Sequence, residues 1–163
     1  MRDYNECQPY VDHLLAEHRR LHALLRQARA VIIQSGGPNR DASLADVAGT
    51  LRHVREELQR HFADEEEGGC LDEAVSRCPR LSAEARRIEA EHPELLHEID
   101  GLIAQALDGD QSVENRIALE KSFSDLCQQL HAYEAAENAL LRQGFGTNVN
   151  GDEDGQPSLI HDF

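Results

Sequence analysis

The chain has 163 residues, of which 40% are hydrophobic and 29% charged, and its formal net charge is −15 at pH 7. This length predicts a single domain with one sizeable core. The negative charge argues against nucleic acid or anionic lipid as a partner, because either would be repelled. No run of about 18 apolar residues occurs, so we expect no membrane span.

The N-terminal sequence MRDYNE lacks the apolar core of a secretory signal, so we expect a cytoplasmic protein. The four cysteines form no Cys-x-x-Cys pair. Free thiols are therefore expected for Cys70 and Cys78, as is usual in a reducing compartment. Cys127 falls on an apolar helical stripe and is expected in the core.

The first expected helix covers residues 9–33. Its apolar stripe is formed by Val11, Leu14, His18, Leu21, Leu25, Ala28 and Ile32. It stops at the breaker-rich segment 35–39. The second expected helix begins near Asp41 or Ser43 as N-cap and ends at Gly68–Gly69.

Residues 70–79 are expected to form a short connecting helix, and Ser82 to cap the third long helix, with Glu84 near a capping-box position. The stripe of this helix continues to Ala106 and contains Pro93, which removes one helical hydrogen bond. We expect a kink beside His92. The alternative is that the long helix begins at Pro93.

The fourth expected helix covers residues 112–144. Four helices with short connections predict an all-α, up-down-up-down four-helix bundle over residues 1–146. Residues 147–163 show no periodicity and are expected to form a flexible acidic tail.

The most informative feature is a break in the apolar stripe of the second helix. Apolar residues occupy every third or fourth position from Leu44 to Leu58, and the next two positions of the stripe hold His61 and Glu65. Buried polar groups are costly unless they are paired or bound to metal. Imidazole and carboxylate together suit iron, manganese or zinc, so this pair predicts a metal site.

The other three long helices also carry ligand-type side chains on their stripes. His18 and His22 lie one turn apart in the first helix, and His92 lies in the third. Tyr133 and Glu137 lie one turn apart in the fourth. Bundles build metal sites from inward-facing side chains of this kind.

Each of these histidines taken alone is more typical of a core residue with a hydrogen-bond partner, which leaves a metal-free helical scaffold as an alternative. At 100° per residue, His53, His97 and His131 are rotated off the stripes and are expected outside the site. We assign no role to His13 or His161.

The candidate ligands resemble the hemerythrin-like, or HHE cation-binding, pattern: a histidine, then His-x-x-x-Glu, then a histidine, then a His-x-x-x-Glu or Asp position, on four successive helices. The matching segments are residues 17–21, 61–66, 91–96 and 133–138. The resemblance covers about residues 8–145 and implies a four-helix bundle with a non-haem di-iron centre. It also implies that His18, His61 and His92 are terminal ligands and that Glu65 and Glu137 are bridging carboxylates.

Two histidines of the family pattern are missing. The position four residues after His92 holds Leu96, and Tyr133 stands where the family has histidine. His22 can replace one of them, because it faces the same side as the first-helix ligand. Tyr133 can bind as a phenolate, since a ferric ion lowers the pKa of a bound phenol. His131 would reach inward only if the helix bulged, so we favour Tyr133.

These expectations point to a protein with two iron ions, or manganese or zinc, that binds, senses or reacts with O2, peroxide or nitric oxide. A shell rich in oxygen ligands favours ferric iron over reversible oxygen carriage. No separate general acid or base is identifiable, so enzymatic activity stays open. The alternative is a non-enzymatic regulatory module whose iron content a protein partner reads.

Overall fold

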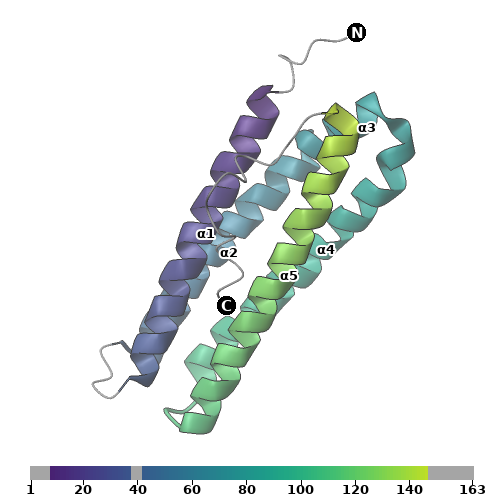
Figure 1. Cartoon of the computed structure of the whole chain (residues 1–163). Helices are drawn as coiled ribbons and strands as arrows, with labels where there is room; N and C mark the ends of the chain where they lie inside the picture. The colour runs from purple at the N-terminus through teal and green to yellow at the C-terminus, as the bar shows by residue number, and fades with distance from the viewer. Residues whose placement is uncertain (1–7, 38–41, 147–163) are drawn as a thin grey trace.

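The computed structural model describes residues 8–37 and 42–146. This part of the chain is all-helical, as predicted. Its elements are α1 (Gln8–Gly36), α2 (Leu44–Glu66), α3 (Cys70–Arg77), the 3-10 helix η2 (Pro79–Leu81), α4 (Ser82–Asp108) and α5 (Val113–Phe145). The four long helices form an elongated bundle, and short α3 lies at one end of it (Figure 1).

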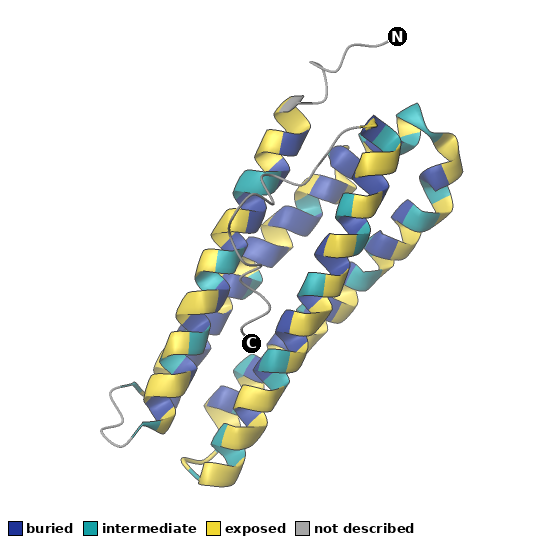
Figure 2. Ribbon diagram, in the orientation of Figure 1, coloured by how far each residue is buried: buried dark blue, intermediate teal, exposed yellow. Residues whose placement is uncertain are grey.

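The long helices pack in a closed ring, α1 on α2, α2 on α4, α4 on α5 and α5 on α1. Chain neighbours are therefore spatial neighbours and run antiparallel, which confirms the up-down-up-down prediction (Figure 1). Each long helix turns a buried face toward the bundle axis (Figure 2), and most residues on these faces are apolar. The fully buried side chains of this core include Leu51, Leu58, Ile99 and Leu119.

The helix ends follow capping chemistry. Ser43 is the N-cap of α2, one of the two predicted positions, and forms a capping box with Asp46. Ser112 is the N-cap of α5, which begins where the sequence predicted a helix start. Both serine side chains accept hydrogen bonds from backbone N–H groups that lack a helical partner. Helix α5 ends at Phe145, one residue beyond the predicted end at Gly144. Its C-cap, Gly146, adopts a left-handed conformation with φ 64°.

The prediction that Ser82 caps α4 is wrong. Leu81 is the N-cap, and α4 has no side-chain cap. The reason is that η2 runs directly into α4, so Ser82 already has helical angles, φ −55° and ψ −44°, whereas an N-cap residue has an extended backbone. The Ser82 hydroxyl instead accepts a hydrogen bond from Arg86 at 3.0 Å.

Pro93 lies inside α4, so the alternative in which that helix begins at Pro93 is wrong. The helix continues because the four-helix core holds its flanks, with His92 and Leu95 both buried. The alternative N-cap Asp41, Cys7 and the expected tail 147–163 lie outside the described residues.

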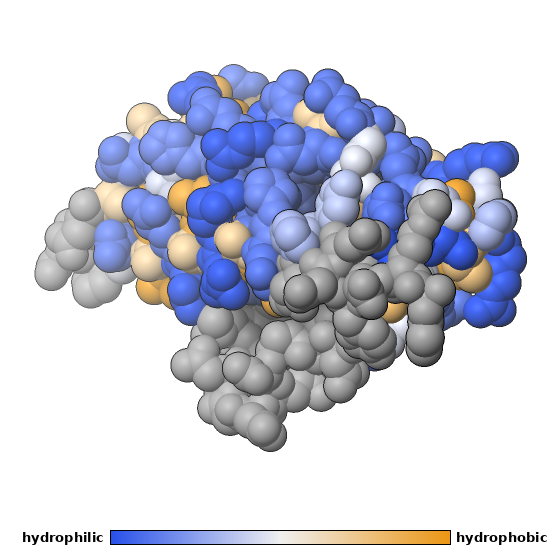
Figure 3. Space-filling view, turned by 90° about the horizontal axis from the view of Figure 1, so that it is seen from above, coloured by the Kyte–Doolittle hydropathy of each residue, from blue (hydrophilic) through white to orange (hydrophobic). Residues whose placement is uncertain are grey.

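The surface matches the composition. Seen from the end of the bundle, described side chains are mainly hydrophilic, with scattered apolar ones between them (Figure 3). No helix in the described ranges is both long and apolar enough to cross a membrane. Cys70, Cys78 and Cys127 are free thiols, and Cys127 is buried in the core, as expected.

Candidate metal centre

The candidate ligands converge in the bundle core although they come from four helices. Helix α1 brings His18, α2 brings His61 and Glu65, α4 brings His92, and α5 brings Tyr133 and Glu137. All six side chains are buried, with exposed fractions between 0% and 6%. The ring of helices places each apolar stripe opposite another, so polar residues on those stripes meet at the axis.

One part of the cluster is formed by two histidines and a carboxylate. Nε2 of His18 lies 3.4 Å from Oε2 of Glu137, and Nε2 of His61 lies 3.8 Å from the same oxygen. One ligand atom from each of these residues lies within 4.8 Å of the others. This set of donors can hold a metal ion.

Glu65 lies between this group and a second one. Its Oε1 is 2.9 Å from Nε2 of His61. Its Oε2 is 2.9 Å from Nε2 of His92 and accepts a hydrogen bond from the Tyr133 hydroxyl at 2.5 Å. The two oxygens of one carboxylate thus face histidines from two different helices.

Two of the histidines are oriented from behind by carboxylates. Nδ1 of His61 lies 2.6 Å from Glu17, and Nδ1 of His92 lies 2.8 Å from Glu66. With the proton on Nδ1 donated to these carboxylates, each Nε2 presents its lone pair to the cluster. Metal-binding histidines show this arrangement almost without exception.

Phe62 packs flat against the ring of His92, with centroids 4.0 Å apart and planes at 6°. Its ring also meets Tyr133 edge-on at 5.5 Å. This aromatic packing leaves the His92 ring little freedom to rotate, so its Nε2 is held toward Glu65.

Several buried polar atoms of the cluster lack a hydrogen-bond partner among the described residues. They are Nε2 of His18, Nε2 of His61, Oε1 of Glu65 and both carboxylate oxygens of Glu137. Nε2 of His61 and Oε1 of Glu65 lie 2.9 Å apart but do not meet the angles of a hydrogen bond. Unpaired buried polar atoms are strongly unfavourable. A cation among His18, His61 and Glu137, whose ligand atoms lie within 4.8 Å of one another, would satisfy the atoms of this group, because ligands about 2.1 Å from an ion and at right angles lie about 3 Å apart.

The electrostatics of the cluster also call for positive charge. Burial lowers the pKa of His61, but the surrounding carboxylates outweigh this and raise it to about 12. Burial and the charge of Glu65 raise the pKa of Glu137. Without metal, protons on the histidines therefore supply the charge that the buried carboxylates require.

His22 does not join this group. Its Nε2 bonds the carboxylate of Glu134 at 2.9 Å, and its ring centroid is 6.4 Å from that of His18. His131 is half-buried, whereas Tyr133 on the same helix is 2% exposed and contacts Glu65 directly. Of the two alternatives on α5, only Tyr133 belongs to the cluster.

Three carboxylates around the cluster escaped sequence analysis: Glu17, Glu66 and Glu134. Two of them left a detectable signal. Glu17 stands three residues after Leu14 on the apolar stripe of α1, and Glu134 stands four residues after the buried Leu130 on α5. Glu66 left none, because its side chain is 53% exposed.

Comparison with known proteins gives one family. The model of the hemerythrin HHE cation binding domain matches residues 10–116. This range includes His18, His61, Glu65 and His92 but ends before the two candidate ligands of α5. Neither the curated proteins nor the solved structures give a match.

Proposed function

Because the chain belongs to the hemerythrin HHE cation-binding family, we propose that its buried cluster holds a non-haem di-iron centre that binds, senses or reacts with O2, peroxide or nitric oxide. The family accounts for metal binding by a helical domain. The choice of iron, the number of ions and the small ligand are the proposal. Manganese or zinc would also accept this mixture of nitrogen and oxygen donors.

The position of Glu65 carries the proposal of two ions. Its two oxygens face Nε2 of His61 and of His92, each at 2.9 Å. Donors therefore lie on both sides of a single carboxylate, which is how a bridging ligand is placed. We assign His18, His61 and Glu137 to one ion and His92 and Tyr133 to the other.

Bound iron would supply an open coordination position and the electrons for reaction with a small oxidant. The protein's side chains supply the rest. Glu17 and Glu66 orient the imidazoles, and the apolar side chains of the core surround the cluster along the bundle axis. Burial and the nearby carboxylates raise the pKa of Tyr133 well above 10, so in the metal-free protein it is a neutral donor to Glu65.

One observation favours a sensing or regulatory module over turnover. Each histidine and carboxylate at the centre is already assigned either as a metal ligand or as the hydrogen-bond partner of a metal ligand. Among the described residues of the cluster, this leaves no separate group to act as general acid or base. Measuring peroxide or nitric oxide consumption by the loaded protein separates the two functions.

Metal analysis with matched variants tests the proposal. We expect about two iron ions per chain after loading and only a weak EPR signal of isolated ferric iron, because magnetic coupling pairs the spins of two neighbouring ferric ions. His61→Ala and Glu65→Ala should each lower the iron content below half, whereas His53→Ala, an exposed change on the same helix, should not. Unchanged iron in the first two variants would contradict the site.

A further inference from the structure

A second group of possible ligands lies outside the buried cluster, where α1 and α2 meet. His13 and Glu17 lie one turn apart on α1, and Asp64 lies in the last turn of α2. Nε2 of His13 is 3.1 Å from Oε1 of Glu17 and 3.4 Å from Oδ2 of Asp64. One ligand atom from each lies within 4.8 Å of the others. We call these three residues the outer cluster.

Glu17 connects the outer cluster to the buried one. Its Oε1 faces His13, whereas its Oε2 bonds Nδ1 of His61 at 2.6 Å. The exposed fraction of the side chain falls from 60% for His13 at the surface to 4% for both Glu17 and His61 inside the bundle. A single carboxylate thus links a solvent-facing histidine with a buried candidate ligand.

The outer cluster lines a pocket of about 360 Å³. Its wall carries four carboxylates, Glu17, Asp64, Glu65 and Glu67, and none of its described lining residues is lysine or arginine. Glu65 is 3% exposed, and its Oε1 is one of the buried atoms that lack a partner. The pocket therefore leads from the surface to a carboxylate of the buried cluster.

The rim of this pocket is fixed by glycines. Gly68 has φ 94°, a conformation that favours glycine. A Cβ on Gly69 would lie 2.6 Å from the backbone oxygen of Asp64. The turn after α2 can therefore fold tightly against the helix end, and this holds Asp64 at the mouth of the pocket.

We propose that His13, Glu17 and Asp64 form an access site that captures a divalent cation such as Fe2+ or Mn2+ and passes it through this pocket to the buried cluster. The step is an exchange of ligands without change of oxidation state. An imidazole with two carboxylates suits these ions, and a carboxylate-lined pocket raises their local concentration. The inference rests on the proposed function, because it assumes that the buried cluster receives the ion.

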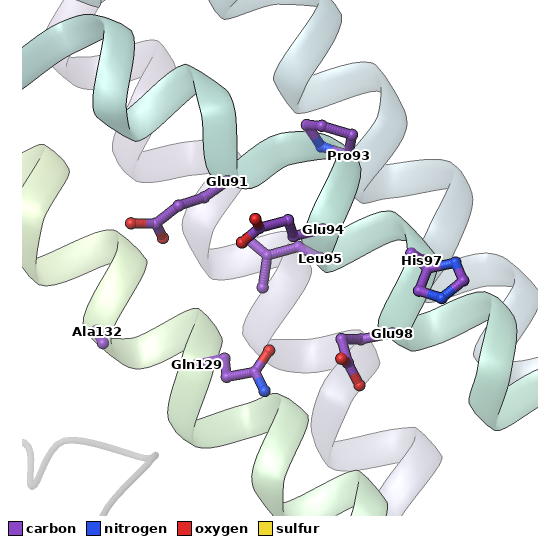
Figure 4. A pocket seen from close by; sticks show the side chains of 8 residues that line it. All are labelled: Glu91, Pro93, Glu94, Leu95, His97, Glu98, Gln129 and Ala132. Atoms are coloured by element: carbon purple, nitrogen blue, oxygen red, sulfur yellow. The ribbon is translucent and has the colours of Figure 1, made fainter.

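A second pocket provides a matched control. It lies between α4 and α5, has a volume of about 610 Å³ and is lined by Glu91, Glu94, His97 and Glu98 among others. Figure 4 shows that the His97 ring points away from the carboxylates of Glu91 and Glu94. This pocket has similar residue types but no convergent ligand set, so changes here alter charge without altering an access site.

The first experiment measures anaerobic uptake of Fe2+ by the metal-free full chain in stopped flow. His13→Gln with Asp64→Asn should slow uptake about fivefold or more, because the capture site is lost, while the final iron content stays the same. Glu94→Gln with His97→Gln carries the same formal charge change and should leave the rate unchanged. Equal rates in all three proteins would overturn the access site.

The second experiment does not depend on the buried cluster. Titration with Mn2+, followed by the EPR signal of the free ion, should show about one more bound ion per chain in the wild type than in the His13/Asp64 double variant. Equal numbers would overturn the access site. The proposed function fails on a different result, namely a wild-type chain that retains no iron after gel filtration.

Discussion

Nδ1 of His61 and a carboxylate oxygen of Glu17 lie 2.6 Å apart, and both side chains are buried. This bond joins α1 to α2 and fixes which nitrogen of the imidazole faces the cluster. Burial alone would raise the pKa of Glu17, but its bond with His61 lowers the pKa to about 2. Glu17 is therefore a carboxylate in the folded protein at neutral pH, and it can accept the Nδ1 proton of His61 throughout this pH range.

The first prediction concerns this orienting role. Glu17→Gln should weaken metal binding about 10- to 100-fold, as is usual when the hydrogen-bond partner of a histidine ligand is changed. Competition with a chelator measures the change. Glu57→Gln is the control, because Glu57 is also a buried carboxylate of this region but pairs with Arg20 and Arg60 instead. Equal affinity in both variants would show that Glu17 does not position a ligand.

The second prediction separates the two histidines of α1. His18→Gln should lower the iron content strongly, because the Nε2 of His18 is aimed at Glu137 and has no other partner among the described residues. His22→Gln should leave it nearly unchanged, because His22 is bonded to Glu134. Measuring the iron content of both purified variants shows which of the two histidines binds iron. A loss of iron in His22→Gln equal to that in His18→Gln would make His22 a ligand.

The different surroundings of these two histidines mark how far the sequence could predict the positions of the candidate ligands. The helical period places His18 and His22 on one face, and it correctly predicted the bundle and the burial of His61, Glu65, His92, Tyr133 and Glu137. It cannot place a residue of α5 beside one of α1. That requires the axial register of two helices about a hundred residues apart, which the packing of the whole core determines.

Two features were missed for different reasons. Ser82 has the right chemistry for a cap, but the preceding η2 gives it helical backbone angles, so it lies inside the first turn of α4. His13 shows no sequence signal, because its partner Asp64 lies on another helix, and periodicity along one helix does not report contacts between helices.

The third prediction tests Tyr133. If its phenolate binds ferric iron, the loaded protein should show a visible tyrosinate-to-iron absorption band that Tyr133→Phe abolishes while most of the iron is retained. The hydroxyl lies 2.5 Å from Oε2 of Glu65 and 2.9 Å from Nε2 of His92, within the ring of donors. A loaded wild type without such a band would leave Tyr133 only as a hydrogen-bond donor to Glu65.

The fourth prediction concerns the packing of α3 on α5. A Cβ on Gly144 would lie 2.6 Å from Cβ and 2.9 Å from Cα of Ala74. Gly144→Ala should therefore destabilise the protein by about 1 to 3 kcal/mol, the usual range for overpacking. Gly101 in α4 is the control, since no described atom outside its own stretch of helix lies within 4 Å of its Cβ position. Gly101→Ala should stabilise by about 0.5 to 1 kcal/mol, and urea unfolding measures both.

The fifth prediction is that metal reverses the pH dependence of stability. In the metal-free protein the pKa of His61 is raised from 6.5 to about 12, because the surrounding carboxylates outweigh burial. The stabilisation this provides is complete below pH 6.5 and is lost as the pH rises toward 12. Glu17 acts in the opposite direction: its pKa is lowered from 4.5 to about 2, so its contribution is present above pH 4.5 and is lost toward 2.

The metal-free chain should therefore be most stable between these limits and should lose at most about 3 kcal/mol through His61 between about pH 6.5 and about pH 8.5. Metal binding requires the deprotonated imidazole, so the loaded protein should instead gain stability over this interval as protons cease to compete. Urea unfolding of both forms at about pH 5.5 and about pH 8.5 compares the slopes. Parallel slopes would contradict the assignment of His61 as a ligand. They would show that His61 keeps a proton on both ring nitrogens in the loaded protein, and a protonated Nε2 cannot bind metal.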